Sequence, residues 1–204
     1  MTGKIVKISG PLVVAEDIEM AKLYDVVKVG KEGLTGEIIE IRGNKCWIQV
    51  YEETSGVAVG EDVISTNEPL SVELAPGILE GIYDGIQRPL DAIAEEGGIF
   101  ITRGISVPAV SRTKKWKFAP KVKVGDEVKT GDIIGSVMET ELIEHRIIVP
   151  LNVQGKIKLI KEGEFQVTDE IAVIEDDQKE VSLTMIQRWP IRKPRPILKK
   201  FIPT

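Results

Sequence analysis

Few residues in the 204-residue chain are of types that carry out acid–base or nucleophilic chemistry. Cys46 follows Lys45, and a neighbouring ammonium can lower the pKa of a thiol. Within an alternating apolar segment, however, we interpret Cys46 as a small apolar residue on one face of a strand. His145 is the only histidine, so a Ser–His–Asp triad would depend on it alone. We interpret His145 as a surface or packing residue.

Metal and acid–base sites find little support in the sequence. One cysteine and one histidine exclude both a disulfide framework and a Cys/His zinc site within the chain. Glu52-Glu53 and Asp176-Asp177 are paired carboxylates, but adjacent strand residues point to opposite faces, so we interpret them as solvated loop charges. The isolated tryptophans are expected in the core or at interfaces, not as nucleobase platforms; they are Trp47, Trp116 and Trp189.

Phosphate-binding and hydrolase motifs are missing from the sequence. There is no GxxxxGK[ST] loop, no GxGxxG after a strand and no GxSxG elbow. We therefore assign no catalytic residue, no cofactor-binding residue and no metal ligand in this chain.

Charge is unevenly distributed along the chain. The formal net charge is −5, but residues 1–110 carry 9 Lys or Arg against 18 Asp or Glu, whereas residues 186–204 carry 6 against none. The basic tail contains Pro190, Pro194 and Pro196, which favour extended backbone. We interpret it as a linker and not as a nucleic-acid arm, which would bind in a strongly salt-dependent way. The sequence shows no signal peptide and no membrane-spanning stretch, so a soluble, cytoplasmic protein is expected.

The first 70 residues have the pattern of a small closed β-barrel. Short alternating segments separated by turn residues indicate strands, and closure removes exposed sheet edges. Gly43-Asn44 is a tight-turn signal. The expected strands are residues 4–8, 12–15, 24–29, 36–41, 45–51, 57–63 and 70–74.

Two short helices and a second β module are expected next. Helices are predicted over residues 77–83 and 90–95, just after Pro76 and Pro89. Residues 113–185 return to short strands, with turns at Gly125-Asp126 and Gly131-Asp132. The predicted fold is thus mainly β: a small N-terminal barrel and a second β-rich domain, joined by short helices.

The second module resembles a biotinyl/lipoyl domain in GDEVKTGDIIGSV, IIVP and GKIKLI. In that family the lysine that carries the cofactor stands eight residues before a proline. Here the proline is Pro150, and Leu142 stands at the lysine position. The resemblance implies a barrel-sandwich topology without carrier chemistry.

Most of the chain resembles the N-terminal part of the catalytic A subunit of A-type and V-type rotary ATPases. The most specific strings are YEETSG, YDGIQRPL and WPIRKPRP, which occur in the family's order. The chain has Ala75-Pro76-Gly77 where the family usually has Gly-Pro-Gly, which suggests that no positive φ is needed at Ala75.

The resemblance implies a layout of four segments. Residues 1–70 resemble the barrel that joins neighbouring subunits in a crown, and residues 71–112 the start of the nucleotide-binding domain. Residues 113–185 resemble the insertion, or bulge, near the peripheral stalk, and residues 186–204 the basic strand that returns to the nucleotide-binding domain. The family's P-loop and catalytic glutamate would follow Thr204, so we expect a truncated subunit.

The resemblance also implies the function of the parent: an archaeal-type ATP synthase that moves protons or sodium ions and binds ATP or ADP with Mg²⁺. Its partners would be the family's B subunits in an alternating hexamer and the central and peripheral stalks, on the cytoplasmic side of the membrane. The fragment itself would be non-catalytic, without a cofactor, bound to no nucleic acid, in contact with the membrane only through the complex, and monomeric. Barrel contacts are expected around Ile5–Ile8 and Ile38–Ile41. On the insertion, contacts with a partner could involve Lys114, Lys115 and Lys117 or Glu175-Asp176-Asp177, although a solvated face is favoured for any single charge.

Two alternatives remain open at this stage. A free-standing two-domain β adaptor would pack residues 71–112 and 186–204 into a self-sufficient unit. A fragment would instead expose apolar side chains there; the candidates are Ile78, Leu79, Ile82 and Ile86. A small hydrolase would need Cys46 or His145.

Overall fold

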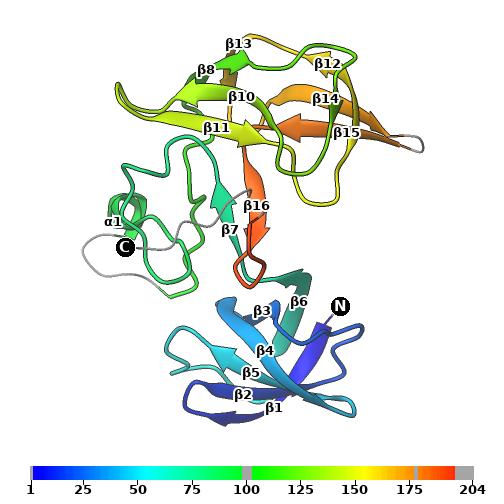
Figure 1. Cartoon of the computed structure of the whole chain (residues 1–204). Coiled ribbons are helices and arrows are strands. Elements are labelled where there is room, and N and C mark those ends of the chain that lie inside the picture. Colours follow the sequence, from blue (N-terminus) through cyan, green and yellow to red (C-terminus); the bar gives the residue numbers. More distant parts are fainter. Residues whose placement is uncertain (1, 98–102, 177–178, 196–204) are drawn as a thin grey trace, which may run out of the picture. The chain divides into compact units, whose positions relative to one another are not determined.

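The computed structural model describes residues 2–97, 103–176 and 179–195 (Figure 1). The chain divides into two compact units, each formed by two stretches of sequence. Unit 1 contains residues 1–71 and 92–107, and unit 2 contains residues 72–91 and 108–204. The predicted mainly β fold is confirmed.

Unit 1 is built on a closed barrel of antiparallel strands in the order β1-β2-β5-β4-β3-β6. Its strands are β1 (Thr2–Ser9), β2 (Leu12–Glu16), β3 (Asp25–Val29), β4 (Leu34–Arg42), β5 (Lys45–Val50) and β6 (Asp62–Pro69). Alternate side chains point inward and form an aliphatic core in which Leu34, Ile38 and Ile48 are fully buried. The turn at Gly43-Asn44 is confirmed: Gly43 has φ 60°, and Arg42 pairs with Lys45 across it.

The strand predicted over residues 57–63 is wrong. Gly56 and Gly60 both have φ 90°, a left-handed backbone that interrupts a strand. The amide of Gly60 donates to the carbonyl of Ile5, and the strand β6 begins only at Asp62. The predicted strand 70–74 exists as β7 (Ser71–Leu74), but it lies outside the barrel and pairs with β16 (Gln187–Pro190).

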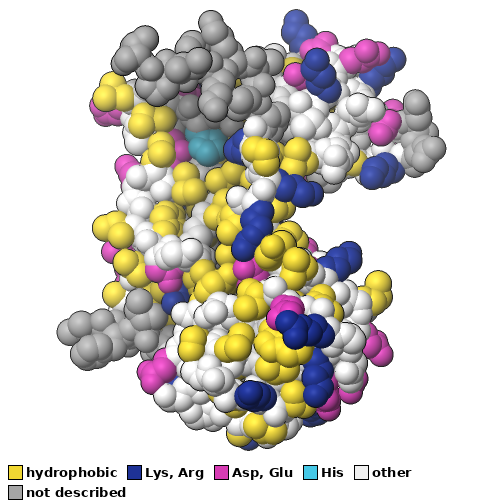
Figure 2. All heavy atoms as spheres, turned by 60° about the horizontal axis from the view of Figure 1, so that its bottom comes forward, with side chains coloured by type: hydrophobic (Ala, Val, Ile, Leu, Met, Phe, Trp, Pro, Cys, Tyr) yellow, Lys and Arg dark blue, Asp and Glu magenta, His cyan; other side chains and the backbone are white. Residues whose placement is uncertain are grey.

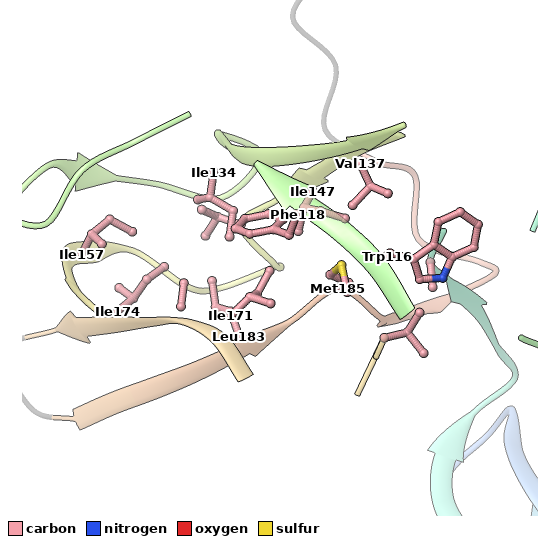
Figure 3. Packing of buried hydrophobic residues seen from close by; sticks show 14 of the residues in the cluster. Trp116, Phe118, Ile134, Val137, Ile147, Ile157, Ile171, Ile174, Leu183 and Met185 are labelled. Carbon is pink, nitrogen blue, oxygen red and sulfur yellow. The ribbon is translucent and has the colours of Figure 1, made fainter. Parts of the chain in front are cut away.

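Unit 2 contains two four-stranded sheets with strand orders β11-β10-β8-β13 and β15-β14-β12-β9. The strands are β8 (Lys115–Pro120), β9 (Glu127–Val128), β10 (Ile133–Met138), β11 (Glu144–Ile148), β12 (Gly155–Ile160), β13 (Gly163–Gln166), β14 (Glu170–Asp176) and β15 (Lys179–Thr184). Phe118, Ile134 and Ile147 from the first sheet and Ile157 and Ile174 from the second belong to one buried cluster (Figure 3). A single apolar core therefore joins the two sheets.

One Asp-capped turn recurs in both units. The aspartate carboxylate accepts a hydrogen bond from the amide three residues earlier, while its own amide donates to the carbonyl of that residue. The carboxylate distances are 2.7 Å for Asp126, 2.9 Å for Asp132, 2.8 Å for Asp169 and 3.0 Å for Asp25. The two predicted Gly-Asp turns are thus confirmed, and Gly125 and Gly131 have φ of 94° and 90°.

Of the two predicted helices, one is present. The helix α1 (Leu90–Gly97) begins right after Pro89, whereas residues 77–83 form turns. Gly77 has φ 101°, which is incompatible with a right-handed helix. Ala75 has no positive φ, as expected. The pair Gly97-Gly98 is a helix-ending signal in the sequence, and Gly98 lies outside the described residues.

Candidate functional site

The carboxylate of Glu139 is the centre of a buried hydrogen-bond cluster in unit 2. Glu139 follows β10, and its side chain is 1% exposed. Its Oε1 accepts from the amides of Gly77 at 2.7 Å and Leu79 at 3.0 Å. Its Oε2 lies 2.8 Å from Nδ1 of His145 on β11. The cluster ties the β10–β11 hairpin to the turns after β7, and this tie explains why residues 77–83 do not form a helix.

The strand β7 is held by a second cluster. Arg112 Nη2 lies 2.6 and 2.7 Å from the two carboxylate oxygens of Glu73. On the backbone of Glu73, the amide donates to Oε1 of Gln87 at 2.6 Å, and the carbonyl accepts from Nε2 of Gln87 at 2.7 Å. The Gln87 side chain therefore bonds one residue of β7 as a neighbouring strand would. The negative charges at the centres of both clusters also act on Tyr83. Burial is the largest cause that raises the pKa of its phenol, and the charges of Glu139 and Glu73 raise it further.

The YDGIQRPL string forms a turn closed by its own side chains. Oδ1 of Asp84 accepts from the amides of Ile86 and Arg88, and its Oδ2 lies 2.7 Å from Nε of Arg88. Burial raises the pKa of Asp84. The hydrogen bonds and charge of Arg88 and the Ile86 amide outweigh burial and hold this pKa below its usual range.

The YEETSG string of unit 1 receives a segment that follows α1 in sequence. Glu52 accepts from the amide of Thr35 at 3.2 Å and from the amide of Gly104 at 2.9 Å. The guanidinium of Arg103 donates to the carbonyls of Glu53 and Ser55 and lies 3.2 Å from the carboxylate of Glu32. Glu52 is thus half-buried and doubly bonded, unlike the solvated charge that the sequence suggested.

Cys46 and His145 are placed in structural surroundings. Cys46 is 2% exposed in the barrel core, and burial raises the pKa of its thiol, which is the opposite of nucleophile activation. His145 pairs with the buried Glu139. The structure therefore gives both residues packing or positioning contacts.

Each tryptophan lies under a cation. Trp116 and Trp189 are buried, and Trp47 is half-buried. The cation-to-ring-centroid distances are 4.1 Å for Lys114 over Trp116, 4.7 Å for Arg195 over Trp189 and 5.4 Å for Arg42 over Trp47. One face of each ring is therefore occupied by a cation of the same chain and is not open for a base to stack on.

The expected contact strands of the barrel have mixed exposure. Ile5 and Ile38 are buried, whereas Ile39 and Ile41 are 43% and 38% exposed. Figure 2 shows Lys and Arg side chains standing among hydrophobic ones on the barrel surface. Of these four isoleucines, only Ile39 and Ile41 are exposed enough to contact a partner.

The charged residues singled out on the insertion are at its surface. Lys114, Lys115 and Lys117 are exposed, and Glu175 lies 3.5 Å from Lys158 on the neighbouring strand. Asp176 is half-buried, while Asp177 lies outside the described residues, as do Pro196 and the residues after it.

Across residues 2–97, 103–176 and 179–195, no three His, Cys, Asp or Glu side chains are grouped so as to hold a metal ion. No helix within the same ranges has both the length and the apolar character to cross a bilayer. The described clusters make structural contacts: the buried carboxylate of Glu139 and the partly exposed carboxylate and guanidinium groups of the other clusters hold segments that are distant in sequence.

Glu139 and the residues tied to Glu52 and Glu73 were missed by the sequence analysis. Glu139 directly follows the mostly apolar stretch 133–138. An ionisable residue that continues an apolar strand indicates a buried charge, so Glu139 could have been singled out from the sequence. Arg103 and Arg112 had no such signal, because their partners lie about 40 to 70 positions away.

The two β domains show which class of protein this chain belongs to. Residues 5–67 match the beta-barrel domain of the ATP synthase alpha/beta family, and residues 107–192 match the barrel-sandwich domain of the ATP synthase alpha/beta subunit. The chain belongs to the ATP synthase alpha/beta family.

Within that family the similarity is to V-type ATP synthase alpha chains. The chain is 61% identical over 202 residues to that of Thermoanaerobacter sp. (strain X514), and 56% identical over 203 residues to that of Clostridium botulinum (strain Alaska E43 / Type E3). These alignments cover 98–99% of this chain but 34% of each relative. The chain thus spans about a third of the relatives' length and matches an N-terminal portion, as the resemblance predicted.

Proposed function

We propose that this chain is the N-terminal, non-catalytic portion of the alpha, or A, subunit of a V-type ATP synthase. The observation that carries the proposal is the joint match of the two β domains and the high identity along nearly the whole chain. The parent subunit would make or hydrolyse ATP, with Mg²⁺, coupled to movement of protons or sodium ions. The described residues do not fit a nucleotide site, because the sequence has no P-loop to cradle phosphates.

The role of this portion would be mechanical. Residues 1–70 would hold alternating A and B subunits together, and residues 113–185 would dock the peripheral stalk. Residues 71–112 and 186–204 would belong to the nucleotide-binding domain. The complex would lie on the cytoplasmic side of the membrane, which the chain would meet only through other subunits. Catalytic, cofactor-binding and metal-binding residues would all lie in the part of the parent absent from this chain.

Exposed apolar side chains favour this function over the free-standing adaptor. Leu79 is 53% exposed and Ile82 is 63% exposed, whereas Ile78 and Ile86 are half-buried. An adaptor with a self-sufficient second unit would cover such residues.

The proposal is tested by joining this chain to the part of the Thermoanaerobacter alpha chain that follows the matched region. The joined chain is co-expressed with the V-type beta chain. We expect the purified complex to hydrolyse ATP and the 204-residue chain with the beta chain to show no hydrolysis. Hydrolysis by the 204-residue chain, or a joined chain that folds but neither assembles nor hydrolyses ATP, would reject the proposal.

The holding role of the barrel has its own test. Ile39→Glu places a charge on the outer barrel surface without entering the core, so assembly with the beta chain should weaken while the melting temperature of the alpha chain stays unchanged. Val59→Glu, at a more exposed site in the turn before β6, is the control. Equal assembly of both variants with the beta chain would show that the barrel surface at Ile39 does not contact it.

A further inference from the structure

The tip of the β10–β11 hairpin exposes large apolar side chains on a braced backbone. Leu142 is 93% exposed, Met138 59% and Ile143 46%. We call these three residues the apolar tip. Surface hydrophobic residues are common singly, but three within six positions at one turn form a patch.

The backbone of the apolar tip is fixed from within. Oγ1 of Thr140 accepts from the amides of Leu142 at 3.3 Å and Ile143 at 3.1 Å. The amide of Glu139 donates to the carbonyl of Ile143 at 3.0 Å. The tip therefore loses little conformational entropy when it is covered, which favours docking.

The apolar tip is continuous with the segment after β7. Leu79, whose amide bonds the carboxylate of Glu139, is 53% exposed. Leu79 and Ile143 line the same open groove of about 340 Å³. Further apolar residues line this groove: Leu74, Ile78, Ile147 and Met185. Polar residues also line the groove, among them Glu144, His145 and Arg195, and of the apolar tip only Ile143 reaches it. The tip and the segment 74–79 thus adjoin through this groove and form one surface with apolar and polar parts.

We propose that this surface docks the polypeptide that follows the matched region in the relatives, within the same subunit. The proposal rests on the proposed function, since the chain spans 34% of the relatives' length and the remainder must pack somewhere. Two observations show that the tip and the segment 77–79 would be covered together. The tip is pinned through Glu139 to residues 77–79, and Leu79 in that segment is itself exposed. Because the hairpin is fixed to this segment, a polypeptide that covers the segment would also bury the apolar tip.

Cysteine labelling tests the proposal, because the native thiol of Cys46 is buried and gives a low background. Leu142→Cys is compared with Val124→Cys, which is 63% exposed in a different turn, the one before β9. We expect a maleimide to label both variants equally in the 204-residue chain. In the isolated joined chain, confirmed as folded by a cooperative melting transition, position 142 should react at least about tenfold more slowly than position 124.

The other outcomes overturn the proposal. Fast labelling of position 142 in the folded joined chain, with protection only in the complex, would assign the tip to another subunit. Concentration-dependent protection in the 204-residue chain would assign it to a second copy. ATP hydrolysis by the complex tests the proposed function separately. If the complex hydrolyses ATP but position 142 reacts freely, only the docking proposal is rejected, and the proposed function stands.

A second measurement does not depend on labelling. Leu142→Glu should leave the melting temperature of the 204-residue chain unchanged and lower that of the joined chain, with Val124→Glu neutral in both. An unchanged melting temperature in the joined chain would contradict docking at the tip.

Discussion

Glu139 accepts the amide of Leu79 across 60 positions of sequence, at 3.0 Å, through a carboxylate that is 1% exposed. A buried charge is tolerated only when its hydrogen bonds are made. Three donors satisfy this carboxylate, so the turn 77–79 and the hairpin it anchors are fixed together.

Removal of this carboxylate should destabilise unit 2. Glu139→Ala leaves two partly buried amides and the imidazole of His145 without their acceptor, at a cost of about 3 kcal/mol in the free energy of unfolding. Urea denaturation measures this loss. The exposed neighbour Glu141→Ala should stay within about 0.5 kcal/mol of the native chain. Equal values for the two variants would contradict the anchoring role.

Gly104 should tolerate no side chain. It has φ 71°, and a Cβ there would overlap the carbonyl oxygen of Glu32. Gly33 has φ 66° with open space around it, so Gly33→Ala isolates the backbone strain. Gly104→Ala should lower the unfolding free energy of unit 1 by about 1–3 kcal/mol more than Gly33→Ala does. Similar losses would show that the segment at Gly104 moves away freely.

The surface carboxylate Glu144 should titrate at low pH. The Lys121 ammonium, 2.6 Å away, is the largest influence; together with the Ser136 hydroxyl and Arg146 it lowers the pKa of Glu144 from 4.5 to about 2. Because the folded-state pKa is depressed, the stabilisation is present above about pH 4.5 and is lost as the pH falls toward 2. Carboxyl NMR titration measures the midpoint. Lys121→Met should raise it, whereas Lys123→Met should leave it unchanged.

Cys46 should be inert until unit 1 unfolds. Burial raises the pKa of its thiol, so the unreactive protonated form dominates at neutral pH, and the barrel core excludes reagent. A chromogenic disulfide reagent should modify it slowly in buffer and fast in denaturing urea. Rapid modification of the folded chain would reveal an opening of β5 that the buried core does not suggest.

Local signals were sufficient for much of the fold. The alternation in residues 4–8 and 45–51 and the tight turn at Gly43 depend on neighbours in sequence, and β1, β5 and their turns follow from them. The Asp-capped turns are equally local. The strand predicted at 57–63 failed because its apolar alternation is outweighed by two left-handed glycines, Gly56 and Gly60.

Long-range partners explain what the sequence could not provide. The local pattern places β7 in the barrel, but its partner β16 lies more than 110 positions further along the chain. The local sequence of residues 77–83 is typical of a helix. It does not reveal the turns found there, because the carboxylate that holds them belongs to Glu139, which is 62 positions from Gly77. The clusters at Glu52, Glu73 and Glu139 all depend on such distant contacts, which composition and periodicity do not encode.

The chain passes between its two units three times, after residues 71, 91 and 107. A cleavage after residue 91 divides both units, a cleavage after residue 71 divides only unit 1, and a cleavage after residue 107 divides only unit 2. A fragment that begins at residue 108 would retain β16 but lose β7, its only strand neighbour among the described residues. Proteolysis after residue 91 should consequently disturb both units, whereas proteolysis after residue 107 should leave unit 1 with its whole sequence and disturb unit 2 alone.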